Sequence, residues 1–471
     1  MTVIEGFVTD LADMLWGNWM LYLLLGLGIY YTVVTGGVQI RSIPCLFREI
    51  FGKSGRSQKR GNGGGAGETG AAGETETAGG TEGTGSLSSM QALCTAVASC
   101  VGSGNIVGVA TALIAGGPGA LFWMWLAAFF GMATKYAEIV LGLCTREKDD
   151  KGAYLGGPMY YISKGLHAPW LGTAAAFLLF IQNAGATLIQ SNTISSVAWE
   201  VYQVPHLLTG LVLATVMSFV IRGGLKRLAG TAQRIVPVMS GLYILGGAVV
   251  VLSHAESFMP MLQSIIQGAF SLEAGAGAAA GITMKEAMRF GVARGLYSNE
   301  AGEGSAAVIH SSAQVDHPSR QGIYGVAEVF IDTMVICSTT GFAILSSGIQ
   351  LEGASAATLA ADAFSTVFPG FKYVVSVSLI LFASTSIMSQ WYFGHVSLVY
   401  IKSSRGDLIY RFLFPVLILY GSLSTVSMVW AIQDCMLGLL IIPNVIALLA
   451  LSPKVGRLTK DFFITVEERG S

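Results

Sequence analysis

The sequence predicts an all-α integral membrane protein with about eleven transmembrane helices. The first observation is composition: the 471 residues are 52% hydrophobic and only 12% charged, about half of the roughly 25% charged residues in an average soluble domain. The second is that several apolar runs reach the ~20 residues that an α-helix needs to cross ~30 Å of hydrocarbon. The third is that lysines and arginines gather in alternate loops, as they do in multi-pass membrane proteins.

The apolar runs are separated by charged residues, prolines and glycines. We predict transmembrane helices at 15–38, 90–115, 119–143, 170–198, 206–222, 232–253, 282–309, 321–349, 373–401, 408–428 and 430–452. Most of the 27 lysines and arginines lie in the odd-to-even loops and the C-terminal tail. Because cytoplasmic loops hold an excess of these residues, we expect a plasma (inner) membrane protein with its N-terminus outside and its C-terminus in the cytoplasm.

A cluster of small and polar residues interrupts the second predicted helix. Gly102 and Gly104 flank Ser103 and are followed by Asn105. Close packing of small residues against a neighbouring helix is one explanation. The other is an unwound break, which frees carbonyls to coordinate Na⁺ and aims a half-helix N-terminus at a carboxylate.

The seventh predicted helix has a similar interruption at 290–295, which reads Phe-Gly-Val-Ala-Arg-Gly. It lies five helices after the first interruption. Paired interrupted helices in the two halves of a chain indicate an inverted-repeat transporter. Because five is an odd number, the second repeat would enter the membrane from the opposite face.

These observations divide the chain into six segments. Residues 55–88 are rich in glycine, threonine and glutamate, a composition that cannot bury enough apolar surface to become ordered. The predicted segments are an extra N-terminal transmembrane helix with its cytoplasmic continuation (1–54), a flexible cytoplasmic insert (55–88), the first repeat (89–253), an extracellular loop (254–281), the second repeat (282–452) and a cytoplasmic tail (453–471). A second long outer loop is expected at 350–372.

Several long runs resemble the alanine or glycine:cation symporter family, the sodium:alanine symporters of the amino acid-polyamine-organocation superfamily. They are 15–41 (LWGNWMLYLLLGLGIYYTVVTGGVQIR), 91–125 (QALCTAVASCVGSGNIVGVATALIAGGPGALFWMW), 135–142 (KYAEIVLG), 156–162 (GGPMYYI), 291–302 (GVARGLYSNEAG) and 321–333 (QGIYGVAEVFIDT). The resemblance covers nearly the whole chain except the insert and the tail. It implies a leucine-transporter-like 5+5 inverted repeat with one additional N-terminal helix, Na⁺ or sometimes H⁺ coupling, and substrates such as alanine and glycine.

The resemblance also implies a sodium site. Its ligands would be the carbonyls of Ala98 and Val101 and the hydroxyls of Thr385 and Ser386. Several oxygens at mid-depth suit a small hard cation. The alternative for the two hydroxyls is a hydrogen bond to a carbonyl one turn earlier in their own helix.

The resemblance places the substrate beside the broken helix. The implied binding residues are Gly102, Ser103, Asn105, Gln190, Phe290 and Gly291. Asn105 would lie beside the substrate carboxylate and also contact a second cation. Gln190 would contact the substrate, although a lone glutamine in a membrane helix serves about as often as an interhelical hydrogen bond.

The chain departs from the family pattern near the expected pocket. Gln390 precedes Trp391 where relatives carry a tryptophan followed by a small residue, so the aromatic ring is displaced by about 100° around the helix. Glu303 stands where an apolar residue is expected, and His395 stands where an acid is expected. These departures predict a pocket that is more polar or larger than an alanine site.

Ionisable side chains within membrane helices are costly and usually functional. Those inside the predicted helices include Lys135, Glu138, Arg289, Arg294, Glu300 and Asp332. We expect Glu300 to pair with Arg294 or Arg289 as a structural ion pair or inner gate, and Lys135 to pair with Glu138 three residues on. Asp332 either holds a neighbouring helix or relays a proton.

The function that these features predict is sodium-coupled symport of a small neutral amino acid, alanine or glycine. The alternatives are a proton-coupled or differently selective carrier, for example of glutamine, and a transporter-like receptor or channel. The sequence has no HExxH, GxSxG or GxxxxGK[ST] motif, so we expect no enzyme activity and no organic cofactor. A formal net charge of -1 gives no indication of a nucleic-acid partner; the expected partners are the amino acid and the lipid bilayer.

Overall fold

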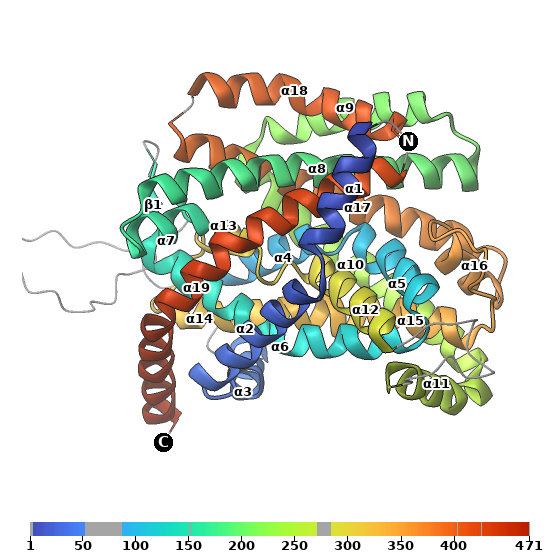
Figure 1. Ribbon diagram of the computed structural model, residues 1–471, viewed down its shortest axis with the longest axis horizontal. Coiled ribbons are helices and arrows are strands. Elements are labelled where there is room, and N and C mark those ends of the chain that lie inside the picture. Colours follow the sequence, from blue (N-terminus) through green and yellow to red (C-terminus); the bar gives the residue numbers. More distant parts are fainter. Residues whose placement is uncertain are drawn as a thin grey trace, which may run out of the picture.

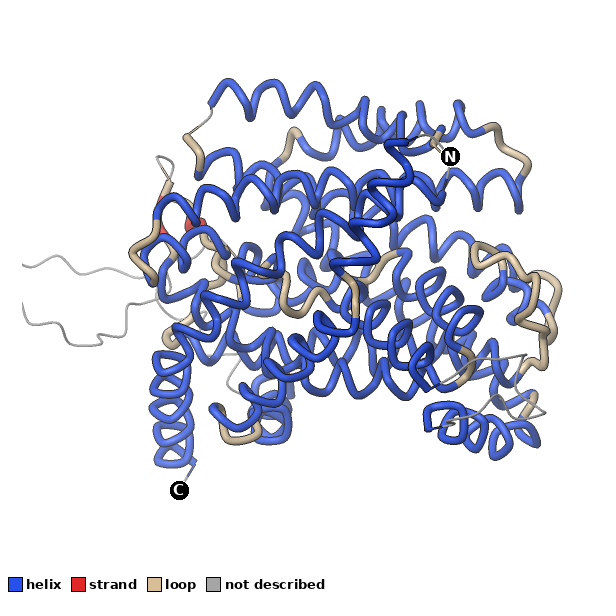
Figure 2. The backbone as a smooth tube through the Cα atoms, viewed as in Figure 1, coloured by secondary structure: helices blue, strands red, loops and turns tan. Residues whose placement is uncertain are grey.

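The structure is a computed structural model of the chain. It describes residues 3–51, 87–149, 152–270, 284–402, 404–424 and 426–470. Most of these residues are helical, and the strands among them form one short antiparallel pair (Figure 2). The pair consists of β1 (Glu147–Lys148) and β2 (Tyr154–Leu155), with Glu147 opposite Leu155.

Helices follow one another along the chain, and η marks a 3-10 or π-helical segment. They are α1 (Val3–Leu15), α2 (Asn18–Val34), α3 (Val38–Phe51), α4 (Ser89–Cys100), η2 (Gly104–Gly108), α5 (Val109–Gly116), α6 (Gly119–Thr145), α7 (Pro158–Gly165), α8 (Pro169–Tyr202), α9 (His206–Ile221), α10 (Gly224–Ser253), η3 (Ala255–Ser257), α11 (Phe258–Phe270), α12 (Met284–Asn299), α13 (Ser305–His310), α14 (Pro318–Val329), η4 (Phe330–Cys337), α15 (Ser338–Ser346), α16 (Leu359–Ser365), α17 (Phe371–Tyr400), α18 (Ser404–Leu423) and α19 (Val426–Gly470).

The helices define a multi-pass membrane protein. Over the described residues, seven helices are long and apolar enough to cross a bilayer, and the number rises to nine when two bent pairs are each counted as one span. Two of the eleven predicted segments do not meet this criterion. The segment 206–222 is the shorter apolar helix α9, and 282–309 is divided between α12 and α13.

Large apolar side chains cover the outside of several helices. Leu207, Leu211 and Phe219 on α9 and Phe412 and Val416 on α18 are all about half exposed or more. An exposed apolar surface of this kind suits contact with lipid tails, among which polar or charged side chains would be costly. The outer helices therefore carry the lipid-facing surface.

Two long helices form the interior framework. Helix α6 packs against α2, α12 and α14, whereas α8 packs against α17, α18 and α19. In Figure 1, α8 lies with α9 and α18 on one side of the molecule, and α6 lies with α12 on the other. Helix α4 and the segment that follows it lie between these two groups, which places the broken helix in the centre.

The predicted break in the second helix is confirmed. Helix α4 begins with a capping box, in which Ser88 and Gln91 bond each other's backbone N–H groups, and it ends at Cys100. Val101 then has extended backbone, with φ -74° and ψ 100°. The chain resumes as the π-helical segment η2 and α5, which are bent by 53° from α4.

The predicted break at 290–295 is wrong, because α12 continues through these residues to Asn299. Gly291 instead permits close packing on α6: a Cβ added there would lie 2.2 Å from the carbonyl oxygen of Ala120. The chain leaves the helix a few residues later, where Glu300, Gly302 and Gly304 have φ of 56°, 93° and 86°. These positive φ values place the turn at 300–304. Glycine adopts this left-handed region without strain, which suits Gly302 and Gly304 to the turn.

The first predicted helix, 15–38, is also divided. Helix α2 ends at Val34, a turn with positive φ at Gly36 and Gly37 follows, and α3 continues at 64° to α2. Both bent pairs therefore turn at or beside glycines.

The predicted loops contain more helix than expected. The described part of the predicted loop 254–281 holds η3 and α11, and α11 packs on α6. The loop 350–372 contains α16, and the predicted tail 453–471 continues α19 to Gly470. Most of the predicted flexible insert, residues 55–86, lies outside the described residues.

Candidate functional site

Side-chain oxygens accept hydrogen bonds from the backbone N–H groups just after the end of α4 and stabilise the non-helical backbone there. The amide N–H of Gly102 donates to Oδ1 of Asn105 at 2.8 Å, and the amide N–H of Ser103 donates to Oε1 of Gln190 at 3.0 Å. Both amides have lost the carbonyl partner that a continuous helix would supply, and buried N–H groups are rarely left unpaired. Asn105 and Gln190 therefore replace the missing helical bonds.

Ser386 of α17 lies against the carbonyl oxygens at this break. Its Oγ is 3.2 Å from the carbonyl oxygen of Val101, 3.4 Å from that of Ala98 and 3.2 Å from that of Phe382. A hydroxyl has one hydrogen to donate, so it cannot satisfy all of these acceptors at once. Carbonyl and hydroxyl oxygens with free lone pairs form the kind of ligand set that a hard cation takes.

The structure thus brings together Ala98, Val101 and Ser386 of the predicted sodium ligands. Thr385 is adjacent, and its hydroxyl donates to the carbonyl oxygen of Phe382 in its own helix at 2.9 Å. This is the local bond that the sequence left open as an alternative. The donated hydrogen does not use the lone pairs of the Thr385 oxygen.

Gly102 lies between Ser386 of α17 and Gln190 of α8. A Cβ added to Gly102 would come within 2.6 Å of Ser386 Oγ and 2.7 Å of Gln190 Nε2. Only a residue without a side chain lets α17 and α8 approach the break this closely. The Ser386 hydroxyl, which contacts the carbonyls, and the Gln190 amide therefore both lie next to Gly102.

Asn105 is fixed from the opposite side by a carboxylate. Its Nδ2 donates to Oδ1 of Asp332 at 2.6 Å, while Oδ2 of Asp332 accepts from Ser298 and Thr333, both at 2.8 Å. All of these side chains are buried. Asp332 accordingly holds neighbouring helices together, the first of the two roles that the sequence allowed.

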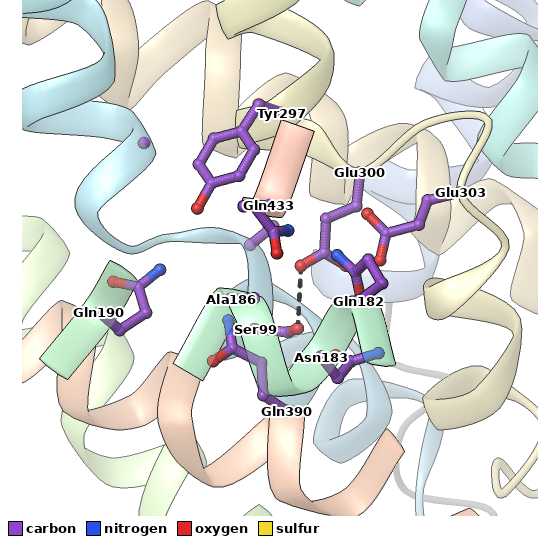
Figure 3. A pocket seen from close by; sticks show the side chains of 12 residues that line it. Ser99, Gln182, Asn183, Ala186, Gln190, Tyr297, Glu300, Glu303, Gln390 and Gln433 are labelled. Atoms are coloured by element: carbon purple, nitrogen blue, oxygen red, sulfur yellow. Dashed lines mark hydrogen bonds between the residues drawn. The ribbon is translucent and has the colours of Figure 1, made fainter. Parts of the chain in front are cut away.

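A polar cavity opens beside the break. It is lined by Ser99, Cys100, Gly104, Gln182, Asn183, Ala186, Gln190, Tyr297, Glu300, Glu303, Gln390 and Gln433, and Figure 3 shows their side chains converging from several helices. Of the predicted substrate residues, Gln190 is in this lining. Gln182, Ala186 and Gln190 are four residues apart on one face of α8, so helical spacing from Gln190 would have indicated Gln182.

Phe290 and Gly291 do not line this cavity. These two residues instead pack near Gly116 and Ala120: a Cβ added to Gly116 would lie 3.2 Å from the Cβ of Phe290, and one added to Gly291 would lie 2.2 Å from the carbonyl oxygen of Ala120. The structure thus places these two predicted pocket residues at the contact between α12 and the helices α5 and α6. Ser103 contributes its backbone N–H at the break.

The departures at 390 and 391 have a clear structural consequence. Gln390 lines the cavity, whereas the Trp391 ring is buried elsewhere and stacks on His395 with ring centroids 5.4 Å apart. His395 in turn bonds Asp407 at 2.5 Å. The one-position displacement therefore directs an amide rather than an aromatic ring into the cavity.

The buried charges pair differently from the prediction. Lys135 does not pair with Glu138: its Nζ lies 2.9 Å from Oε1 of Glu328 and donates to the carbonyl oxygen of Asn299 at 2.7 Å. Glu138 accepts a hydrogen bond from Asn444 instead. The Lys135 pair is almost inaccessible, with side-chain exposures of 0% and 1%.

Glu300 likewise has partners other than arginine. Its carboxylate accepts from Ser99 at 3.1 Å and from Ser305 at 2.6 Å. Arg294 lies beside Asp434, with 3.8 Å between charged atoms, and over the Trp430 ring. The predicted pairing of Glu300 with Arg294 or Arg289 is therefore not found among the described ion pairs.

Solved structures show which fold this is. The structure of MhsT in complex with L-phenylalanine superposes with a TM-score of 0.54 at 13% identity, covering 82% of this chain and 99% of that chain. A variant of the manganese transporter of Eremococcus coleocola superposes with a TM-score of 0.51 at 11% identity, covering 75% of each chain. At these identities the likeness concerns the fold alone. With the apolar helices, it defines the class as a multi-pass helical membrane protein with the fold of these two proteins.

The sequence profile of the sodium:alanine symporter family matches residues 1–470, and the chain belongs to this family. It is 37% identical over 464 residues to the sodium/alanine symporter AgcS of Methanococcus maripaludis, covering 97% of this chain and 96% of that protein. It is 33% identical over 464 residues to the probable sodium/glutamine symporter GlnT of Bacillus subtilis, covering 98% and 91%. The resemblance predicted from the sequence motifs is confirmed, and the family is one of amino acid:cation symporters.

Proposed function

We propose that this protein is a sodium-coupled symporter that carries a small neutral amino acid, alanine or glycine, across the plasma membrane by alternating access. The observation that supports it most is the position of Ser386, whose hydroxyl meets the carbonyl oxygens of Val101 and Ala98 at the broken end of α4. In this proposal Thr385 completes the Na⁺ site with its hydroxyl oxygen. The relative AgcS is named a sodium/alanine symporter.

The amino acid would bind on the other side of Gly102. The N-terminal end of η2 offers backbone N–H groups and the positive end of a helix dipole to a carboxylate, and Gln190 already bonds the Ser103 N–H there. Asn105 would stand beside this carboxylate and near a second cation. Phe290 and Gly291 would act only indirectly, by setting the packing of α12.

Coupling would follow from the shared helix break. Sodium bound at Val101 and Ala98 orders the backbone that also binds the amino acid, so each ligand raises the affinity for the other by the same factor. The proposed architecture is a 5+5 inverted repeat, 89–253 and 282–452, preceded by one extra helix, with the N-terminus outside and the C-terminus in the cytoplasm.

A second candidate substrate is glutamine. The amides of Gln182, Gln390 and Gln433 line the cavity, and such groups can bond a polar side chain that alanine lacks. The relative GlnT is named a probable sodium/glutamine symporter. Proton coupling is the corresponding alternative for the driving ion.

Uptake into proteoliposomes tests these assignments. Radiolabelled alanine should accumulate when Na⁺ is higher outside, and uptake should collapse when choline replaces Na⁺. Unlabelled glycine or glutamine is added in parallel reactions, and the extent to which each one inhibits uptake of labelled alanine ranks the substrates. Uptake that is indifferent to Na⁺ but abolished by collapsing a pH gradient would contradict sodium coupling.

A further inference from the structure

Two carboxylates project into the cavity from the turn between α12 and α13. Glu300 and Glu303 both line the cavity, and the Glu303 side chain is only 4% exposed. The positive φ of Glu300, Gly302 and Gly304 shapes the turn that presents them. Figure 3 shows the two carboxyl groups close to each other beside Gln182.

These carboxylates have no cationic partner among the described ion pairs. Glu300 accepts hydrogen bonds from the uncharged hydroxyls of Ser99 and Ser305. The buried Lys135, whose Nζ donates to the carbonyl oxygen of Asn299 next to Glu300, is already paired with Glu328. Two buried like charges side by side are unfavourable without a compensating positive charge.

Two amide side chains that face the same cavity carry atoms without a hydrogen-bond partner among the described residues. Gln433 is fully buried, and neither its Nε2 nor its Oε1 makes a hydrogen bond within the described part of the chain; the same holds for Oε1 of Gln182, a side chain that is 4% exposed. Leaving a buried polar atom unbonded costs about 1–3 kcal/mol. Such atoms at a cavity wall point to a ligand that would satisfy them.

The unsatisfied amide oxygens and the two carboxylates together form an oxygen-rich wall. Carboxylate and amide oxygens suit a hard cation or an ammonium group. Over the described residues, no three His, Cys, Asp or Glu side chains gather as a metal site, which argues against a multivalent metal held by side-chain charges. The ligand that fits is one monovalent positive charge.

We propose that Glu300, Glu303, Gln182 and Gln433 form a further cation subsite, distinct both from the carbonyls around Ser386 and from the second cation expected beside Asn105, that binds a single monovalent positive charge. The charge can come from a further Na⁺ ion or from the ammonium group of a cationic amino acid side chain. This inference rests on the proposed function, because it concerns the same cavity. It assigns a role to Glu303, where the family pattern predicted an apolar residue.

The test compares Glu303→Gln with the matched control Glu352→Gln, which removes a charge from an exposed loop. Thermal unfolding of the purified full-length protein is followed during titration with NaCl alone, with choline chloride as the ionic-strength control. It is followed again with lysine and with glutamine at fixed Na⁺. Glu303→Asp keeps the charge and should retain most of the binding.

If the subsite takes Na⁺, Glu303→Gln should weaken stabilisation by NaCl alone at least tenfold. If it takes an ammonium group, the NaCl curve should be unchanged and stabilisation by lysine should weaken at least tenfold relative to glutamine. Should Glu303→Gln fail to fold, Gln433→Met replaces an amide by an apolar chain of similar size, and it should weaken the same titration.

Glu303→Gln curves that match those of the wild type and Glu352→Gln in both titrations would overturn the subsite. If Glu303→Gln does not fold, Gln433→Met curves that match the wild type would do the same. A wild-type protein that responds to neither Na⁺ nor any amino acid would instead count against the proposed function. The two failures are therefore distinguishable in one set of measurements.

Discussion

The hydroxyl oxygen of Ser386 lies 3.2 Å from the carbonyl oxygen of Val101, although the two residues are 285 positions apart in the chain. This contact joins α17 to the broken end of α4. It is possible because Gly102 has no side chain to keep the helices apart.

Replacing Ser386 by alanine should weaken sodium binding. If the lost oxygen ligand contributes as much to the free energy of Na⁺ binding as a typical hydrogen bond does to stability, the loss is about 1–1.5 kcal/mol. That corresponds to a roughly tenfold higher Na⁺ concentration for half-maximal uptake. The measurement is the Na⁺ concentration that gives half-maximal alanine uptake. Ser397→Ala is the control, since Ser397 is buried on the same helix and only bonds the carbonyl of Phe393. Equal Na⁺ requirements in the two variants would exclude Ser386 from the site.

Thr385 provides a separate test of the sodium site. Thr385→Val keeps the shape of the side chain but removes the oxygen that donates to Phe382. If the lone pairs of this oxygen bind Na⁺, the variant should need several-fold more Na⁺ for half-maximal uptake. An unchanged Na⁺ dependence would assign the hydroxyl to the local bond alone.

Two glycine substitutions should differ in whether they change ligand binding or the unfolding midpoint. Gly102→Ala pushes against the movable ends of Ser386 and Gln190, so it should impair Na⁺ and amino acid binding with a small change in the unfolding midpoint. Gly291→Ala meets the backbone oxygen of Ala120 at 2.2 Å, so it should mainly lower the unfolding midpoint. Thermal unfolding with and without ligands separates the two effects; a purely destabilised Gly102→Ala protein would contradict the proposed junction.

The buried pair of Lys135 and Glu328 should affect the free energy of unfolding far more than an exposed pair does. Lys135→Met leaves the buried Glu328 carboxylate with only His310 beside it among the described ion pairs, which should lower the free energy of unfolding by about 3–5 kcal/mol. Lys164→Met, at a pair whose side chains are 43% and 55% exposed, should cost less than about 1 kcal/mol. Adding Glu328→Gln to Lys135→Met should restore part of the loss. Equal unfolding midpoints for Lys135→Met and the wild type would contradict this account.

Asp332 should support binding through Asn105. Asp332→Asn replaces one accepting oxygen by a donor, so the carboxamide cannot accept from all the groups that Asp332 now serves, Asn105, Ser298 and Thr333. We expect weaker alanine binding, measured by isothermal titration calorimetry at saturating Na⁺. Asp362→Asn, at an exposed position, should bind as the wild type does. The same affinity in both variants would refute the link.

Much of this protein follows from the sequence itself. Long apolar runs determine membrane helices, because a buried backbone in lipid must bond within its own segment. The sequence of Gly102, Ser103 and Gly104 predicted the first break correctly, and the long motifs identified the family. Of the departures from the family pattern, Gln390 and Glu303 line the polar cavity, whereas His395 contacts Trp391 and Asp407 instead.

Only the tertiary structure decided where the seventh predicted helix, 282–309, is interrupted and which charges pair. Glycine has no Cβ, so it serves equally for close helix packing, as at Gly291, and for a left-handed turn, as at Gly302; only the neighbouring helix distinguishes these uses. The partner of Lys135 is Glu328, far away in sequence, rather than Glu138 on the same helix. Contacts between distant segments depend on how whole helices pack, and local spacing does not encode that packing.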